Sequence, residues 1–270
     1  MGSEVRTPAV AGQFYPGRPD VLLRDVRQYT AVKGNRRRAL GCVVPHAGYM
    51  YSGHVAGAVY GSLELPKHYV ILCPNHTGMG APLSIMSEGA WETPLGEAAI
   101  DSELASNLKS RFPLLTEDAE AHRSEHALEV QLPFLQVLVK QFTFVPITIG
   151  ISQLDILQGL GHAISEIIGN FQEPVLVIAS SDMNHFESDT ITRVKDRQAI
   201  NQIIALNPEG LHEVVRRECI SMCGYGPAVA MLTAARDAGA RRAELIKYAT
   251  SGDVSQDRHR VVGYAGIIVQ

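Results

Sequence analysis

The sequence of 270 residues has only four cysteines and one tryptophan, and aromatic residues make up 6% of it. Four cysteines are too few for the dense disulfide framework that holds small secreted domains together. Two of them, Cys42 and Cys73, lie inside apolar runs, where cysteine acts as a small hydrophobic residue. Residues 1–4 are followed by no apolar stretch of the kind found in signal peptides. We therefore expect a protein of the reducing cytoplasm.

The sequence also lacks long hydrophobic runs and a strong excess of either charge. No apolar run approaches the ~20 residues that a membrane-spanning helix needs. The net charge is -4 and the isoelectric point is about 6.2. The basic run Arg36–Arg38 is short, precedes an expected strand and is typical of a solvated loop. Neither a membrane nor a nucleic acid is therefore an expected partner.

Three widespread catalytic motifs are missing from the sequence. It has no Gly-x-Ser-x-Gly elbow, no P-loop and no Gly-x-Gly-x-x-Gly after an expected strand. These absences exclude the commonest hydrolase, NTPase and dinucleotide-binding classes. The sequence does have a hydrophobic content of 46%, which is enough for the core of one large α/β domain.

Apolar runs rich in Val and Ile alternate with helical patterns along the whole chain. Strands are expected near residues 41–45, 69–73, 83–87, 143–149, 175–179, 244–249 and 262–269. Helices are expected near residues 20–31, 53–62, 100–111, 125–140, 153–169, 189–204, 208–217 and 227–239. This alternation predicts a single α/β domain over residues 1–270, with a mostly parallel sheet between two helical layers. Residues 77–94 are expected to form a short hairpin or flap, a candidate lid beside His76.

Histidines follow three of the expected strands. His46 and His76 come directly after Pro45 and Asn75, and His185 follows the strand 175–179 by a few residues. Ligands bind outside the carboxyl ends of strands in open α/β sheets, so the three imidazoles are expected to meet at one edge. Imidazole is the commonest protein metal ligand and the usual general base near neutral pH. The alternative for each histidine alone is an ordinary turn residue.

Two acid–histidine pairs add candidate groups. Asp182 lies three residues before His185 and could orient its imidazole, although an N-cap at the next helix is an alternative for Asp182. His126 and Glu129 are also three apart and would share one helix face, with a solvated face as the alternative.

Cys223 precedes Gly224 and the start of an expected helix at Pro227. A helix N-terminus stabilises a thiolate, so Cys223 could be a ligand or a nucleophile. Cys219 lies four residues earlier, but this Cys-x3-Cys spacing is not typical of a metal site. A structural role for Cys223 remains the alternative.

Seven short motifs occur in the order of one known family. They are Ala11-Gly12-Gln13-Phe14-Tyr15-Pro16, Pro45-His46-Ala47-Gly48-Tyr49, Pro74-Asn75-His76, Trp91-Glu92-Thr93-Pro94-Leu95-Gly96, Glu125-His126-Ala127-Leu128-Glu129, Ser180-Ser181-Asp182-Met183-Asn184-His185 and Cys223-Gly224. Over nearly its whole length the chain thus resembles the Memo family (mediator of ErbB2-driven cell motility), whose prokaryotic members are called AmmeMemoRadiSam system protein B. Each motif is modest, but all seven in order are specific.

The resemblance implies a fold, a metal and roles for several residues. Memo proteins look like class III extradiol dioxygenases, which have a central sheet flanked by helices and hold Fe(II) with two histidines and a glutamate. By motif, His46 and His76 match the metal histidines, His185 matches the acid/base histidine, and Cys223 stands where those enzymes have a carboxylate. The resemblance favours Fe(II), and a His/His/Cys set also suits Cu or Zn. The family name further implies association with a radical-SAM protein and an AMMECR1-like protein.

Two functions of different classes follow from these residues. The first is a metal-dependent redox enzyme of the dioxygenase-like kind, in which Asp182 orients His185. Its substrate pocket would be lined by Tyr49, Asn75, His126 and Glu129. The second is a protein that binds a metal or a (phospho)peptide in the same cleft without turnover. A metal-activated hydrolase is a weaker third alternative.

Overall fold

A computed structural model describes residues 5–32 and 34–270. Its strands are β1 (Val5–Arg6), β2 (Gly41–Val44), β3 (His68–Pro74), β4 (Leu83–Ile85), β5 (Ala90–Thr93), β6 (Gly96–Ile100), β7 (Thr116–Glu117), β8 (Thr143–Ile149), β9 (Val175–Ser180), β10 (His185–Glu187), β11 (Ala243–Thr250) and β12 (Val261–Val269). Its helices are α1 (Pro19–Tyr29), α2 (Tyr49–Gly61), α3 (Ser102–Arg111), α4 (Glu120–Arg123), α5 (His126–Glu129), α6 (Leu132–Leu138), α7 (Leu154–Asn170), α8 (Asp189–Ile204), α9 (Pro208–Arg217), α10 (Tyr225–Asp237) and α11 (Gly252–Ser255).

The strands form one mixed sheet whose centre is parallel. The order along the sheet is β1-β5-β6-β8-β3-β9-β2-β12-β10, with β11 beside β12 and β4 beside β8 and β7. Strands β6, β8, β3, β9 and β2 run parallel, whereas β12 is antiparallel to β2 and to β11. The carboxyl ends of β2, β3 and β9 therefore lie at the same edge of the sheet.

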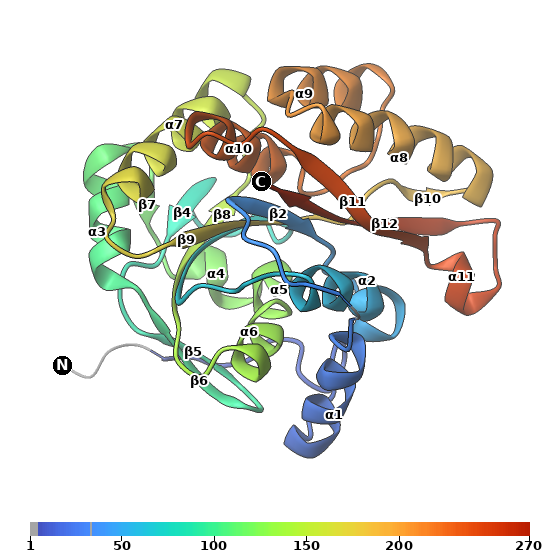
Figure 1. The fold of residues 1–270 in the computed structure, drawn as a ribbon, viewed down its shortest axis with the longest axis horizontal. Helices are drawn as coiled ribbons and strands as arrows, with labels where there is room; N and C mark the ends of the chain where they lie inside the picture. The colour runs from blue at the N-terminus through green and yellow to red at the C-terminus, as the bar shows by residue number, and fades with distance from the viewer. Residues whose placement is uncertain (1–4, 33) are drawn as a thin grey trace.

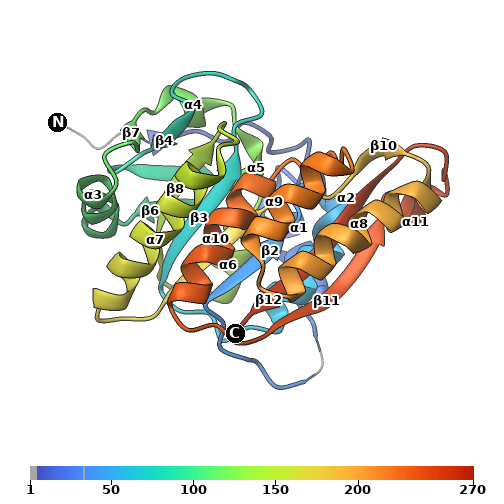
Figure 2. The same cartoon turned by 90° about the horizontal axis from the view of Figure 1, so that it is seen from above.

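Helices cover both faces of the sheet, because side chains of a strand alternate between its faces. In β3, Val70 and Leu72 pack with α7 and α10, while Tyr69, Ile71 and Cys73 pack with α1, α2, α5 and α6. Figure 1 shows these two helical layers above and below the sheet, and Figure 2 shows α7 to α10 lying across it. The predicted three-layer α/β/α architecture is confirmed.

Most of the expected elements are present, but two expectations are wrong. The helix expected over 125–140 is broken into α5 and α6, because Pro133 in the first turn of α6 cannot donate a helical hydrogen bond to α5. The short hairpin or flap expected over 77–94 is not formed in the part of the chain that the structure describes, because β4 and β5 pair with other strands. There, β4 joins the sheet beside β8, and Trp91 of β5 is fully buried.

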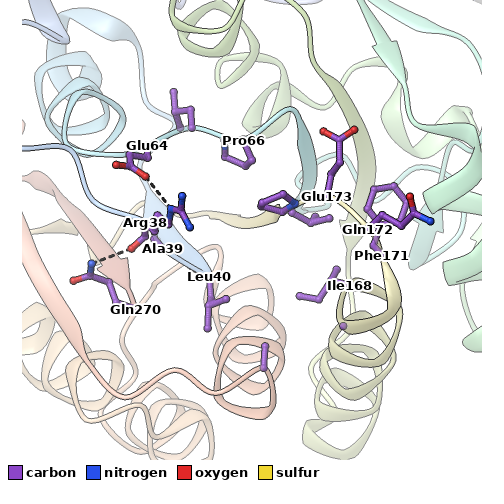
Figure 3. A pocket seen from close by; sticks show the side chains of 15 residues that line it. Arg38, Ala39, Leu40, Glu64, Pro66, Ile168, Phe171, Gln172, Glu173 and Gln270 are labelled. Carbon is purple, nitrogen blue, oxygen red and sulfur yellow. Dashed lines mark hydrogen bonds and ion pairs between the residues drawn. The ribbon is translucent and has the colours of Figure 1, made fainter.

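A cavity of about 720 Å³ lies at the opposite edge of the sheet, before the amino ends of β2, β3 and β9. Figure 3 shows Arg38, ion-paired with Glu64, on one side of this cavity and Ile168 and Phe171 on the other. The helices among the described residues include none that is long and apolar enough to cross a membrane.

Candidate metal centre at the carboxyl edge of the sheet

Two imidazoles and one thiol meet where β2, β3 and the start of α10 come together. The candidate ligand atoms of His46, His76 and Cys223 all lie within 4.8 Å of one another. The Cys223 Sγ lies 3.2 Å from the His46 Nε2, and the rings of His46 and His76 are 5.1 Å apart between centroids. The expected convergence of His46 and His76 at one sheet edge is present.

A hydrogen-bonded serine fixes the proton of His46. The Ser180 hydroxyl lies 2.6 Å from the carbonyl of Ala127, to which it donates its hydrogen, and 2.9 Å from the His46 Nδ1. Because that hydrogen is already donated, His46 Nδ1 must carry a proton, which leaves Nε2 with a free lone pair. Burial of the ring lowers the pKa of His46 well below its ordinary value, so the imidazole is neutral. Neutral imidazole is the form that binds metals.

The buried carboxylate of Glu125 fixes the position of the proton on His76. The Glu125 Oε1 lies 2.9 Å from the His76 Nδ1, and its Oε2 accepts a 2.6 Å hydrogen bond from the backbone N–H of His76. Burial opposes ionisation of Glu125, but the hydrogen bonds from His76 and Ala127 outweigh it and lower its pKa. The carboxylate therefore receives the Nδ1 proton, and His76 Nε2 is free to bind an ion. Metal-ligating histidines are commonly oriented by such a carboxylate.

Close packing places Cys223 against the end of β9. Gly224 follows it, and a Cβ on this glycine would overlap the Ser180 carbonyl oxygen and the Ser181 side chain. The Gly224 N–H also donates to the Ser181 hydroxyl at 3.1 Å. Burial raises the pKa of the Cys223 thiol, and a bound cation would reverse that effect by favouring the thiolate.

The hydrogen bonds of Asp182 go to the backbone at His46, and none joins its carboxylate to His185. Its Oδ1 accepts hydrogen bonds from the backbone N–H groups of His46 at 2.8 Å and Ala47 at 3.3 Å, and burial raises its pKa to about 6. The Nδ1 of His185 lies instead 2.9 Å from the Ser221 carbonyl oxygen. The hydrogen bonds of the structure thus place Asp182 on the backbone of the β2 turn. The alternative of an Asp182 N-cap is also wrong, because Ser188 caps α8.

Two residues expected to line a substrate pocket belong to the core. The Glu129 carboxylate is fully buried against Arg6 and Tyr15. Tyr49 is 4% exposed, and its hydroxyl donates to the carbonyl of Val130 at 2.7 Å. Tyr49 is the first residue of α2, which begins earlier than expected, and hydrogen bonds hold Glu129 against the N-terminal segment.

His126 and Asn75 lie beside the candidate metal centre. The His126 ring stacks on that of His76, with centroids 4.8 Å apart and planes 18° apart, and meets the His46 ring edge-on at 5.5 Å. Asn75 uses its side chain to hold the turn after β3, where its Oδ1 accepts from the Gly78 N–H at 2.9 Å. His126 therefore packs against both candidate histidines, and Asn75 shapes the turn that carries His76.

The sequence pattern did not indicate Glu125 and Ser180 as partners of the two histidines. Glu125 caps α5, and its side chain lies before the helix, so the helix-face spacing selected Glu129. A carboxylate at an N-cap position next to a candidate histidine was the signal that could have identified it. Ser180 is the last residue of β9, and pairing of β9 with β2 places it beside Val44, two residues before His46.

The fold and the site define a three-layer α/β/α protein with a His/His/Cys donor group at the carboxyl edge of its sheet. The family described as Memo-like protein matches residues 6–268. A MEMO1 family protein of Methanosarcina barkeri is 44% identical over 268 residues, which cover 98% of this chain and 100% of that protein. Another from Methanothermobacter thermautotrophicus is 42% identical over 274 residues, covering 97% and 99%. The chain therefore belongs to the Memo family.

A solved structure with a similar fold comes from Escherichia coli K12, where it is described as an uncharacterized protein. The TM-score is 0.61 at 12% sequence identity, and the match covers 86% of this chain and 100% of that one. At this identity the likeness concerns the fold alone.

Proposed function

We propose that this Memo family protein binds one metal ion through the Nε2 atoms of His46 and His76 and the Sγ of Cys223. The main support is that both His46 and His76 carry their ring proton on Nδ1, which leaves each Nε2 free to bind an ion. Ser180 and Glu125 occupy the Nδ1 side of the two histidines, which directs both free lone pairs towards the thiol. These donors fit a metal site, because each histidine has an outer partner and the ligand atoms lie close enough to share one ion.

Fe(II) is the favoured ion on family grounds, and Cu and Zn are the alternatives on donor chemistry. Two imidazoles suit iron, copper and zinc, and a thiolate adds preference for the softer ions. Three protein ligands also leave coordination positions open, as catalytic sites require.

We further propose that the site is that of a redox enzyme in which His185 carries protons. The bound ion would supply Lewis acidity and electrons to a small molecule held at its open positions. His185 is half-buried, and its Nδ1 lies 2.9 Å from the carbonyl oxygen of Ser221, two residues before Cys223, so it adjoins the segment that carries a proposed ligand. His126 would hold the molecule against the His76 ring. All four cysteines are free, which supports a reducing cytoplasmic location.

The test is reconstitution of the purified protein without oxygen, using Fe(II), Cu(I) and Zn(II) separately. Wild type is expected to retain one ion per chain, and Cys223→Ser and His46→Ala are expected to lose it while keeping the wild-type circular dichroism spectrum. Cys219→Ser is the matched control, because this exposed cysteine lies outside the donor group. Stoichiometric metal in a His46→Ala/His76→Ala double variant would overturn the proposal. One bound ion without any turnover would support the non-catalytic alternative.

A further inference from the structure

Asn184 is a fully buried amide that joins three segments around the candidate site. Its backbone N–H donates to the Asp196 Oδ1 of α8 at 2.8 Å. Its Nδ2 donates to the Glu187 Oε2 at 2.7 Å, and its Oδ1 accepts from both the N–H and the hydroxyl of Ser221 at 3.1 Å. The carboxylate can only accept and the Ser221 N–H can only donate, so the orientation of the amide is fixed.

Ser221 in turn contacts His185 at two points. The Ser221 hydroxyl accepts a 2.7 Å hydrogen bond from the backbone N–H of His185, and the Ser221 carbonyl oxygen lies 2.9 Å from the ring Nδ1. A carbonyl oxygen can only accept, so the Nδ1 of His185 carries a proton. In the neutral ring the Nε2 then has a free lone pair. Ser221 also lies two residues before Cys223, so the same segment carries a proposed metal ligand.

The backbone beside His185 is held in an unfavourable conformation. Phe186 has φ 62°, in the left-handed region that non-glycine residues rarely adopt. The pairing of β10 with β12 is irregular here, since His185 faces Val262 and Glu187 faces Val261. Phe186 is therefore the extra residue of a β-bulge, and such bulges often aim a side chain at an active site. The hydrogen bonds of Asn184 hold both ends of the bulge, through Glu187 directly and through Ser221 to His185.

We propose that Asn184 and Ser221 are positioning residues, which keep neutral His185 in the Nδ1–H form so that its Nε2 is the proton acceptor of the site. They also fix the segment of Cys223 to the strand that carries His185. The inference deepens the proposed function and rests on it for the role of His185, but the proton position is a property of the chain without metal.

The experiment is imidazole 15N NMR of the metal-free, full-length protein labelled at histidine. Spectra are recorded at about pH 8, above the ordinary histidine pKa of ~6.5. The His185 signals are assigned by their loss in His185→Gln. Wild type is expected to show a protonated Nδ1 and an unprotonated Nε2. Asn184→Ala and Ser221→Ala are expected to shift His185 towards a mixture of the two forms, and Ser221→Thr, which keeps the hydroxyl, is expected to restore the wild-type signals.

A second readout is metal affinity, with circular dichroism of each variant expected to match the wild type and so to exclude loss of the fold. Affinity for Zn(II) is expected to fall in Asn184→Ala, because Asn184 holds Ser221, which lies two residues before Cys223. Thr190→Ala, on the exposed face of α8, is the control and should leave both readouts unchanged. A wild-type His185 protonated on Nε2, or variants whose His185 signals match the wild type, would overturn the inference. Failure of the wild type to bind any of Fe(II), Cu(I) and Zn(II), with the expected NMR signals present, would overturn the proposed function alone.

Discussion

Replacing Glu129 by alanine is expected to destabilise the fold while leaving the proposed metal centre able to bind an ion. The carboxylate has no exposed surface and accepts four hydrogen bonds. They come from Arg6 and the backbone of Ala9 at 2.8 Å, the Tyr15 hydroxyl at 2.7 Å and the backbone of Val10 at 3.1 Å. Its loss leaves the buried Arg6 guanidinium without its counter-charge.

The expected loss of unfolding free energy depends on the contacts that Arg6 keeps in the variant. Removing one partner of a buried ion pair costs about 3–5 kcal/mol. Arg6 still donates to the carbonyls of His122 at 2.7 Å and Glu125 at 2.8 Å, and it stacks on the Trp91 ring at 4.0 Å. We therefore expect a loss of unfolding free energy at the lower end of this range, about 3 kcal/mol. At roughly 2–4 °C per kcal/mol for large domains, the midpoint of thermal unfolding should fall by about 6–12 °C.

The assay is thermal unfolding followed by circular dichroism, together with metal stoichiometry at a temperature where the variant is folded. Glu120→Ala is the control, because Glu120 pairs with Arg123 on the surface at 2.7 Å and should cost less than about 0.5 kcal/mol. An unchanged melting midpoint for Glu129→Ala, combined with lost metal or ligand binding, would refute the structural role of Glu129. It would indicate that Glu129 acts in the candidate site.

Three further changes test other contacts. Glu125→Gln is expected to weaken metal binding about 10- to 100-fold, by competition titration, because His76 loses its orienting carboxylate; unchanged affinity would contradict this. Gly224→Ala is expected to cost about 1–3 kcal/mol in urea denaturation, because its Cβ meets the end of β9. Burial raises the pKa of Asp196 to about 7, so the folded state holds a proton that the unfolded state releases above about pH 4. Stability from this group therefore falls as the pH rises from about 4 to 7. In urea denaturation, the unfolding free energy of Asp196→Asn relative to wild type should rise by roughly 4 kcal/mol between about pH 4 and pH 7. A relative free energy that does not change with pH would refute the raised pKa of Asp196.

The sequence predicted the sheet well where its strands are long and buried on both faces. The run 143–149 matches β8 at both ends, and the three strands before His46, His76 and Asp182 are present as β2, β3 and β9. The short strands β1 and β7, of two residues each, have no periodicity to detect. They exist because their neighbours in the sheet supply hydrogen-bond partners.

The convergence of the proposed ligands His46 and His76 at one sheet edge was predictable from the sequence, whereas the residues that hydrogen-bond to them were not. A histidine after a buried parallel strand has a position that the fold dictates. The partners of Glu129 lie up to 123 residues away in the chain, and Tyr49 depends on where α2 begins, so neither follows from local spacing. The same holds for Ser221, whose contact with His185 joins residues 36 apart. Side-chain contacts between distant segments decide these roles.

X-ray absorption at the metal edge of the Zn(II)-loaded protein tests the central claim most directly. A His/His/Cys centre predicts one sulfur at ~2.3 Å and two imidazole nitrogens at ~2.0–2.1 Å, with the remaining ligands from solvent. The sulfur contribution should disappear in Cys223→Ser and persist in Cys219→Ser. A shell of oxygen ligands alone in the wild type, or a sulfur that remains in Cys223→Ser, would contradict the account.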